Sequence, residues 1–231
     1  WSMLVFAWRC LFLKNKKLGK PDVIVVSSMP IFPILTGILL KVKNRNCKLI
    51  FEIRDLWPES LIQLGKVNRA HPAVLFIRIF ERIGYAHCDH IVSLLPNSVE
   101  YFKKFSIPES KISIIPNGID VTLKRQSLSQ DVQKILDNDK FNIMYTGTIG
   151  FPNCIELLIE GLLLTNNEEL HCFIVGDGHQ KEKCMEMAMN MNNVTFINKV
   201  PKNQVQHILT YADICFIGAH DLSVYQYGVS A

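Results

Sequence analysis

Short apolar runs and amphipathic segments alternate along the whole chain, which is the pattern of parallel β-sheets joined by crossover helices. Most of the runs are rich in Val and Ile and end in polar or glycine-containing turns, as expected for strands buried on both faces. They predict strands at 23–27, 48–53, 90–95, 112–115, 141–146, 171–175, 194–197 and 214–218.

Helical spacing of apolar residues between these strands predicts helices near 3–17, 34–42, 58–64, 72–87, 97–105, 131–136, 153–164, 179–191 and 203–210. The strand pattern stops at Pro116-Asn117-Gly118-Ile119-Asp120 and begins again at 141. The predicted fold is therefore α/β, with two Rossmann-like domains of the doubly wound type. We place an N-terminal domain at 1–119, a polar linker at 120–140 and a C-terminal domain at 141–231.

The composition excludes several classes of protein. Among 231 residues 48% are hydrophobic and 20% charged, and the formal net charge of +4 is mild, so we expect a soluble globular protein without a nucleic-acid partner. Seven cysteines lack C-x-x-C spacing and predict reduced thiols in a cytoplasmic protein, and no metal site is expected. The apolar stretch 23–40 is interrupted by Pro30 and Pro33, which favours a strand and a helix over a membrane span, and no signal-peptide pattern is present.

Charged residues gather where the strand at 48–53 ends. Glu52, Arg54, Asp55 and Glu59 surround Trp57 there, and Pro58 fixes the backbone for a following helix. Open α/β sheets bind ligands at the carboxyl ends of their strands, so we favour a functional site. The alternative is a solvated loop in which Arg54 forms a surface ion pair with Asp55 or Glu59.

Glycine-containing turns follow the strands of the second half. Gly147-Thr148-Ile149-Gly150 stands between a strand and a helix, where backbone N–H groups can face an anion. Gly176-Asp177-Gly178 ends the next strand in the same way. Since Gly147 to Gly150 match neither G-x-G-x-x-G nor a P-loop, a tight turn without a ligand explains that stretch about as well.

Lysines accompany these turns. Lys181 begins a helix, where its charge opposes the helix dipole and suggests a compensating anion or acid, although a solvated helix face would also explain it. Lys199-Val200 follows the third strand of this half at the same edge of the sheet. The three loops are therefore expected to line one crevice.

Two basic amphipathic segments bear on membrane contact. Residues 1–20 combine Lys and Arg with Trp and Phe, and residues 74–85 place Arg78 and Arg82 among Phe and Ile. Such helices can lie on anionic lipid. The simpler explanation, which we favour, is that both cover their sheets.

The strings Glu52-Ile53-Arg54-Asp55-Leu56-Trp57-Pro58-Glu59-Ser60 and Pro116-Asn117-Gly118-Ile119-Asp120, with Val175-Gly176-Asp177-Gly178 and Ala212-Asp213, resemble glycosyltransferase family 4. Within that family the chain looks most like the sugar transferases of bacterial surface-polysaccharide and O-antigen clusters. The resemblance implies a GT-B fold and sugar transfer with retention of anomeric configuration, without a metal or other cofactor.

The resemblance also assigns residues. It implies that Gly147 to Gly150 face the diphosphate of a nucleotide-sugar donor, expected to be UDP-linked. Gly176, Asp177, Gly178 and Lys181 would lie beside the donor, and Lys199 and Val200 would border the base. On the acceptor side, Arg54, Asp55 and Glu59 are the catalytic candidates, and Glu52 and Trp57 would bind a lipid-linked or saccharide acceptor.

Several family features are missing from the sequence. The chain starts at Trp1, in what resembles a later helix, and it ends before the acidic helix motif of the donor domain. A basic residue that many relatives carry in the first donor loop is also absent from 148–153. We therefore expect both domains to be incomplete, and the alternative to an active transferase is an inactive fragment or a binding module without turnover. A nucleotide-sugar epimerase is disfavoured because G-x-G-x-x-G and a Y-x-x-x-K pair are lacking.

The expected setting is the cytoplasm, with peripheral contact to the inner face of the cytoplasmic membrane. The expected partners are a nucleotide-sugar and an acceptor for capsule or O-antigen synthesis.

Overall fold

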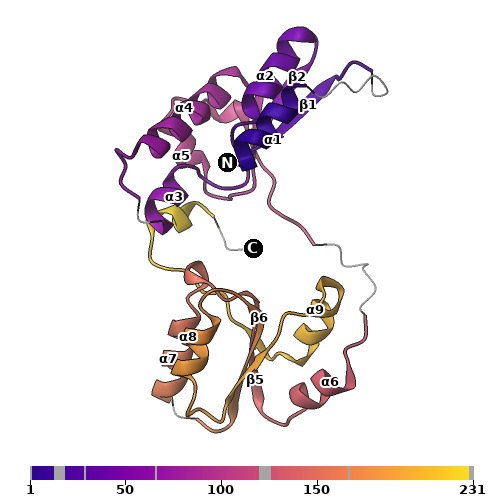
Figure 1. Cartoon of the computed structure of the whole chain (residues 1–231), viewed down its shortest axis with the longest axis vertical. Helices are drawn as coiled ribbons and strands as arrows, with labels where there is room; N and C mark the ends of the chain where they lie inside the picture. Colours follow the sequence, from indigo (N-terminus) through magenta and orange to yellow (C-terminus); the bar gives the residue numbers. More distant parts are fainter. Residues whose placement is uncertain are drawn as a thin grey trace. The chain divides into compact units, whose positions relative to one another are not determined.

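The computed structural model describes residues 2–12, 19–28, 30–65, 67–119, 126–165 and 167–228, which form two compact units (Figure 1). Unit 1 contains Trp1–Gly118 and Leu222–Val229, and unit 2 contains Ile119–Asp221. Each unit has its own parallel sheet and its own buried core. In the described part of the chain, no helix has the length and apolar character needed to cross a bilayer.

Unit 1 is built on four parallel strands in the order β1-β2-β3-β4. The strands are β1 (Val23–Ser27), β2 (Lys48–Ile53), β3 (His90–Ser93) and β4 (Ile112–Ile114). The strand positions expected from the sequence are confirmed, with β3 two residues and β4 one residue shorter than expected. On β2, alternate residues Leu49, Phe51 and Ile53 are buried, so the period-two pattern of a strand holds in the observed packing.

The helices of unit 1 are α1 (Ser2–Leu11), α2 (Ile34–Lys43), α3 (Glu59–Leu64), α4 (Pro72–His87) and α5 (Val99–Lys103), with 3₁₀ turns η1 (Glu109–Lys111) and η4 (Ser223–Tyr227). The longest, α4, begins with Pro72 and is capped by His71, whose ring nitrogen accepts from the Ala73 amide at 3.2 Å. The expected helix at 3–17 is described only as far as Leu11, and its remainder lies largely outside the described residues.

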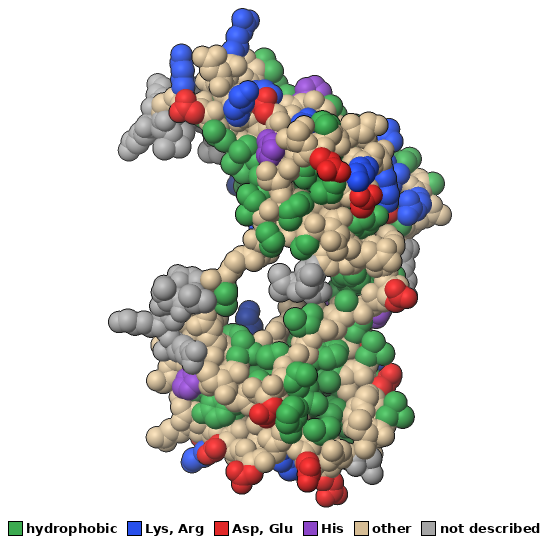
Figure 2. All heavy atoms as spheres, turned by 180° about the vertical axis from the view of Figure 1, so that it is seen from behind, with side chains coloured by type: hydrophobic (Ala, Val, Ile, Leu, Met, Phe, Trp, Pro, Cys, Tyr) green, Lys and Arg blue, Asp and Glu red, His purple; other side chains and the backbone are tan. Residues whose placement is uncertain are grey.

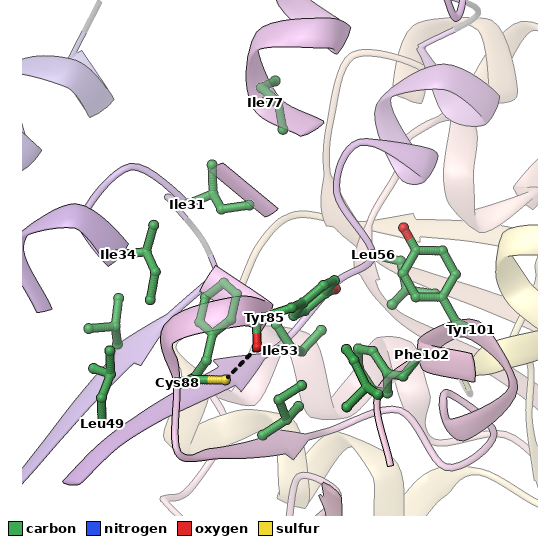
Figure 3. Close-up of a cluster of buried hydrophobic side chains, with 14 of the residues drawn as sticks. Ile31, Ile34, Leu49, Ile53, Leu56, Ile77, Tyr85, Cys88, Tyr101 and Phe102 are labelled. Atoms are coloured by element: carbon green, nitrogen blue, oxygen red, sulfur yellow. Dashed lines mark hydrogen bonds between the residues drawn. The ribbon is translucent and has the colours of Figure 1, made fainter. Parts of the chain in front are cut away.

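The core of unit 1 joins the sheet to α2, α4 and α5 (Figure 3). Tyr85 of α4 packs edge-on against Phe102 of α5, with ring centroids 5.5 Å apart. Gly84 allows α4 to approach the sheet closely, because a Cβ atom there would lie 2.5 Å from the ring of Phe51. The second basic amphipathic segment, 74–85, thus places Ile77 and Tyr85 in the core, as expected for a helix that covers its sheet.

Unit 2 is a second four-stranded parallel sheet, in the order β7-β6-β5-β8. Its elements are β5 (Phe141–Thr148), β6 (Leu170–Asp177), β7 (Val194–Ile197), β8 (Ile214–Cys215), α6 (Gln130–Leu136), α7 (Ile155–Thr165), α8 (Lys181–Met187), α9 (Lys202–Ile208), η2 (Phe151–Asn153) and η3 (Leu209–Tyr211). In Figure 1, α7 and α8 lie on one face of the sheet and α6 and α9 on the other. A separate apolar cluster fills each face.

Several boundaries in unit 2 differ from the expected ones: β8 ends at Cys215 instead of 218 and α8 at Met187 instead of 191, while β5 and β6 are longer for a physical reason. β5 and β6 extend two residues beyond their predicted ends, because strand pairing continues through Gly147 opposite Gly176 and through Thr148 opposite Asp177. The residues read as turns in the sequence are thus partly strand ends. In the predicted linker 120–140, the described residues 126–140 pack in unit 2, where Leu128 and Leu136 enter its core.

The segment 222–228 lies in unit 1, so its predicted place in a C-terminal domain at 141–231 is wrong. Val224 is buried in the core of unit 1, and its amide donates to Gln63 Oε1 at 3.0 Å. The Asn97 amide donates to the carbonyl of Tyr227 at 3.0 Å. The chain thus returns from unit 2 to unit 1, and this return depends on contacts between residues more than 120 positions apart.

Candidate functional site

A pocket of about 660 Å³ opens in unit 2 at the carboxyl ends of β5 and β6. Seven of the residues predicted to bind a donor line this pocket: Gly147, Thr148, Gly176, Asp177, Gly178, Lys199 and Val200. The expectation that the three loops line one crevice is therefore confirmed. Its volume is within the range of small-molecule sites, about 300–1,000 Å³.

Gly176 and Gly178 line the pocket where they let two backbone segments approach closely. Their φ angles are +151° and +158°. A Cβ atom on Gly176 would lie 1.8 Å from the carbonyl oxygen of Gly147, and one on Gly178 would lie 2.2 Å from that of Ile149. Packing of the two strand ends alone thus requires glycine here, whether or not an anion binds.

The loop after β5 is held from within unit 2. Tyr145 Oη donates to the Thr148 carbonyl at 2.6 Å, and Asn153 Nδ2 donates to the same oxygen at 2.7 Å. Ile149 is fully buried, and its amide donates to the Asp177 carbonyl at 2.9 Å. Of the predicted loop, Thr148 therefore reaches the pocket while Ile149 anchors the loop in the core. The role of Tyr145 and Asn153 in holding this loop was not predicted from the sequence.

Gly150 is buried beside His179 and does not line the pocket. The short turn η2 separates it from α7, so the loop does not pass directly into that helix. The sequence had predicted a helix directly after this turn, beginning at 153, whereas α7 begins at Ile155. The Gly150 carbonyl accepts from the Asn153 amide at 3.0 Å, which closes this turn.

Lys199 and Lys202 bring positive charge to the pocket. In the described residues neither ammonium group has a hydrogen-bond or ion-pair partner, so both are available to an anion. Lys202 was missed because it stands at the start of α9, away from the glycine turns. Lys181 lies outside the lining: its Nζ donates to Asn198 Oδ1 at 2.7 Å and to the Gly176 carbonyl at 3.2 Å. These neutral oxygens provide partners for the Lys181 charge at the helix start.

In unit 1, Asp55 organises the beginning of α3. Its Oδ1 accepts from the Leu56 amide at 2.8 Å and also from the buried Ser60 hydroxyl. The Trp57–Pro58 peptide bond is cis, and Trp57 packs against the unit 1 core. The carboxylate of Asp55 thus stabilises the turn whose charged residues predict a functional site.

The other residues predicted to lie on the acceptor side are Glu52, Arg54 and Glu59, and they do not share the contacts of Asp55. Glu52 lies on β2 opposite Ser27, and the Arg54 amide donates to Ser28 Oγ at 3.0 Å. Among the described residues Arg54 forms no ion pair, so the surface pairs considered for it are not seen. Glu59 instead pairs with Arg69 and Arg78, each at 3.0 Å, and its side chain is only 15% exposed.

A buried acid in α4 was not recognised from the sequence. Glu81 Oε1 accepts from Tyr101 Oη at 2.6 Å and from Tyr85 Oη at 3.2 Å, while Oε2 has no partner. Burial raises the pKa of Glu81 to about 7, although the two hydroxyl donors oppose the rise. Its signal in the sequence was a lone acid on the apolar face of an amphipathic helix.

Metal ligation has no obvious place in the described ranges, where no three His, Cys, Asp or Glu side chains are grouped closely enough to hold an ion.

Comparison with known proteins gives matches in sequence and in fold. The family model described as Glycosyltransferase Family 4 matches residues 1–123. WcaI of Escherichia coli (strain K12), which is named as a colanic acid biosynthesis glycosyl transferase, is 23% identical over 193 residues, covering 80% of this chain and 47% of WcaI. The chain therefore spans about half the length of this curated relative.

Two solved structures illustrate the likeness in fold. HepE (Alr3699) of Anabaena, in complex with UDP and glucose, matches with a TM-score of 0.64 at 12% identity, covering 94% of this chain and 56% of HepE. The catalytic domain of starch synthase IV from Arabidopsis thaliana, bound to ADP and acarbose, matches with the same score at 11% identity and the same coverage. The predicted α/β, GT-B fold class is thus confirmed.

Proposed function

The chain belongs to glycosyltransferase family 4, and from this premise we propose that it carries out sugar transfer from a nucleotide-sugar to a glycan acceptor in bacterial surface-polysaccharide synthesis. The observation that carries the proposal is the unit 2 pocket, where backbone, glycine and lysine groups of three strand ends converge. We further propose that transfer proceeds with retention and without a metal ion. The likeness to WcaI supports a surface polysaccharide such as capsule, O-antigen or a colanic-type polymer.

The pocket suits a diphosphate for electrostatic reasons. Negative charge develops on a departing nucleoside diphosphate, and cations fixed nearby stabilise that charge more in the transition state than in the ground state. Lys199 and Lys202 supply these cations, and the glycines at the ends of β5 and β6 leave room for close approach. The donor is proposed to be UDP-linked, since HepE was solved with UDP.

The acceptor is proposed to be lipid-linked, and unit 1 to meet the inner face of the cytoplasmic membrane. Exposed apolar side chains on α2 and α4 support this: Leu39 is 49%, Phe76 45% and Ile79 54% exposed. Figure 2 shows hydrophobic side chains at the surface of both units and Lys and Arg side chains among those of unit 1. Apolar and cationic groups on one surface favour anionic lipid.

Donor binding is tested by calorimetry with UDP. Replacing Lys199 and Lys202 together by Gln should weaken UDP at least tenfold, because two charge-assisted contacts are lost. The matched control is Lys183→Gln, which removes an exposed lysine that pairs with Glu156 outside the pocket. These variants are a better test than a bulky residue at Gly147, because a Cβ atom there would lie 2.8 Å from Tyr145 Oη and would disturb the loop itself. Wild-type affinity in the double variant would refute the assigned pocket.

Transfer itself is tested with labelled UDP-sugars and bacterial membranes as the acceptor source, with and without EDTA. Incorporation into lipid that persists in EDTA, with retained anomeric configuration in the product, would support the proposal. Binding of UDP without incorporation would instead favour a binding module. Glu59→Gln should lower incorporation at least tenfold and leave UDP affinity unchanged, since Glu59 lies in unit 1.

A further inference from the structure

A second pocket, of about 270 Å³, lies within unit 1 and is strongly cationic. Four positive side chains line it: Arg69, Arg78, Arg82 and Lys104. They come from the loop after α3, from α4 and from the end of α5, and the returning turn η4 contributes Ser223 and Tyr227 to the wall. Residues distant in sequence therefore gather their positive charge around one small cavity.

Only part of this charge is neutralised by the described residues. Glu59, which lines the pocket, pairs with Arg69 and Arg78. Arg82 has no ion-pair partner in the described ranges, and Lys104 contacts only neutral groups: its Nζ donates to Tyr227 Oη at 2.8 Å. Four cations thus face one carboxylate, a balance that attracts an anion.

A second carboxyl group near the pocket offsets only part of this charge. Glu81 stands behind Tyr101, a lining residue whose hydroxyl donates to it. Burial raises the pKa of Glu81 to about 7, so this acid is only partly ionised at neutral pH.

The donor groups match phosphate oxygens. A guanidinium group presents planar N–H pairs that bind phosphate bidentately, and an ammonium group adds a compact point charge. Among the residues that the structure describes, Arg78 gives one Nη atom to Glu59, Lys104 gives one of its three ammonium protons to Tyr227, and the Arg82 guanidinium has no partner. Spare donors therefore point to a highly charged ligand with several acceptor oxygens.

We propose that this pocket binds the phosphate or diphosphate group of a ligand. Phosphate binding here is independent of the unit 2 pocket, whereas identifying the ligand as the phosphorylated acceptor rests on the proposed function. With about 270 Å³ against about 660 Å³, the cavity takes a smaller group than the donor pocket does.

The test is calorimetry with inorganic pyrophosphate at saturating UDP, so that the unit 2 pocket is occupied. Arg82→Gln combined with Lys104→Gln should weaken pyrophosphate binding at least tenfold. The matched control, Lys43→Gln with Arg45→Gln, removes two exposed cations of the same unit outside the pocket and should change affinity less than twofold. UDP affinity and the circular dichroism spectrum of the first double variant should remain those of the wild type.

Equal pyrophosphate affinity in the wild type and the Arg82/Lys104 variant would overturn the inference, even if the donor proposal holds. Loss of pyrophosphate binding in this variant would support the inference, even if UDP does not bind at all. Farnesyl diphosphate, used below its micelle concentration, distinguishes the source of the phosphate. Tighter binding than pyrophosphate indicates a prenyl-linked ligand, and equal binding indicates recognition of the phosphate alone.

Discussion

Gly176 shows how a single position can meet a structural demand and line a proposed binding pocket. Its backbone has a φ of +151°, and the Gly147 carbonyl stands where a side chain would begin. Both glycines line the proposed donor pocket. A substitution here is therefore expected to damage the fold of unit 2 as well as its binding of a nucleotide.

Gly176→Ala should destabilise unit 2 by about 2–3 kcal/mol or more, through backbone strain and the clash with Gly147. Gly161→Ala is the control, because Gly161 lies exposed in α7 with open space around its Cα. That change should stabilise the unit by about 0.5–1 kcal/mol. Hydrogen exchange of β5 and β6 amides measures both effects. Unchanged protection in Gly176→Ala would contradict the assigned backbone contact.

Glu81 should make the stability of unit 1 depend on pH. Its pKa of about 7 in the folded state is above the ordinary value of 4.5, so the folded state holds the proton more tightly. The resulting stability is fully present below about pH 4.5 and is lost as pH rises through 7. Between pH 5 and pH 8 the loss amounts to about 2–3 kcal/mol.

Glu81→Gln should remove this dependence, so that its unfolding free energy relative to the wild type rises by about 2–3 kcal/mol from pH 5 to pH 8. Urea unfolding followed by Trp fluorescence reports on unit 1, because Trp57 packs against its core. Glu109→Gln, at a side chain that is 68% exposed, serves as the control and should show no comparable trend. If the difference in unfolding free energy between Glu81→Gln and the wild type stayed constant from pH 5 to pH 8, Glu81 would not be a buried acid that binds a proton in the folded state.

Among the elements, the returning turn η4 is fastened mainly by side-chain and backbone contacts across a long sequence interval. Gln63 Oε1, at the end of α3, accepts from the Val224 amide at 3.0 Å and from Ser223 Oγ at 3.2 Å. Val224 adds an apolar contact to the core of unit 1. The side chain of Gln63 thus connects α3 to the wall of the phosphate pocket.

Gln63→Ala should loosen η4, because the loss of Gln63 Oε1 leaves the amide of the buried Val224 without a partner, at a cost of about 1–3 kcal/mol. Amides at 223–228 should exchange at least tenfold faster, while those of β5 and β6 keep their rates. Gln206→Ala on α9 is the matched control and should leave 223–228 unaffected. Wild-type exchange at 223–228 in Gln63→Ala would show that this glutamine does not hold the segment.

At the level of the whole molecule, each unit carries a separate sheet and core, and the proposed ligand pockets are divided between them. Ligand binding stabilises the part of a protein that forms the site. A nucleotide is therefore expected to protect unit 2 without protecting unit 1.

UDP at about 100 times its dissociation constant should slow the exchange of the most protected unit 2 amides by an amount equivalent to about 2.7 kcal/mol. Exchange of the β2 and β3 amides should be unchanged, and in the Lys199/Lys202 variant, whose UDP affinity is at least tenfold weaker, the same UDP concentration should protect unit 2 by about 1.4 kcal/mol or less. Equal protection of both units would show that they are coupled and would contradict the assignment of the nucleotide to unit 2 alone.

Much of the fold was predictable because it depends on local patterns. The β-branched run at 23–27 and the alternation at 48–53 predict strands without knowledge of their partners, and both are observed. The glycines at 176 and 178 likewise marked the sheet edge where the unit 2 pocket opens, since only a few backbone conformations require that residue. Here the sequence identified the position, and the structure shows that close packing of two strand ends requires glycine there.

The sequence by itself determined the alternation of strands and helices, the division between two sheets and the motif at Arg54-Asp55-Leu56-Trp57-Pro58, because these features are encoded in neighbouring residues. Only the tertiary structure decided which charges meet. Glu59 pairs with Arg69 and Arg78, Lys202 joins Lys199 at the unit 2 pocket, and Arg82 reaches the same cavity as Lys104. Such contacts depend on where chain segments cross, and local propensity contains no information about that.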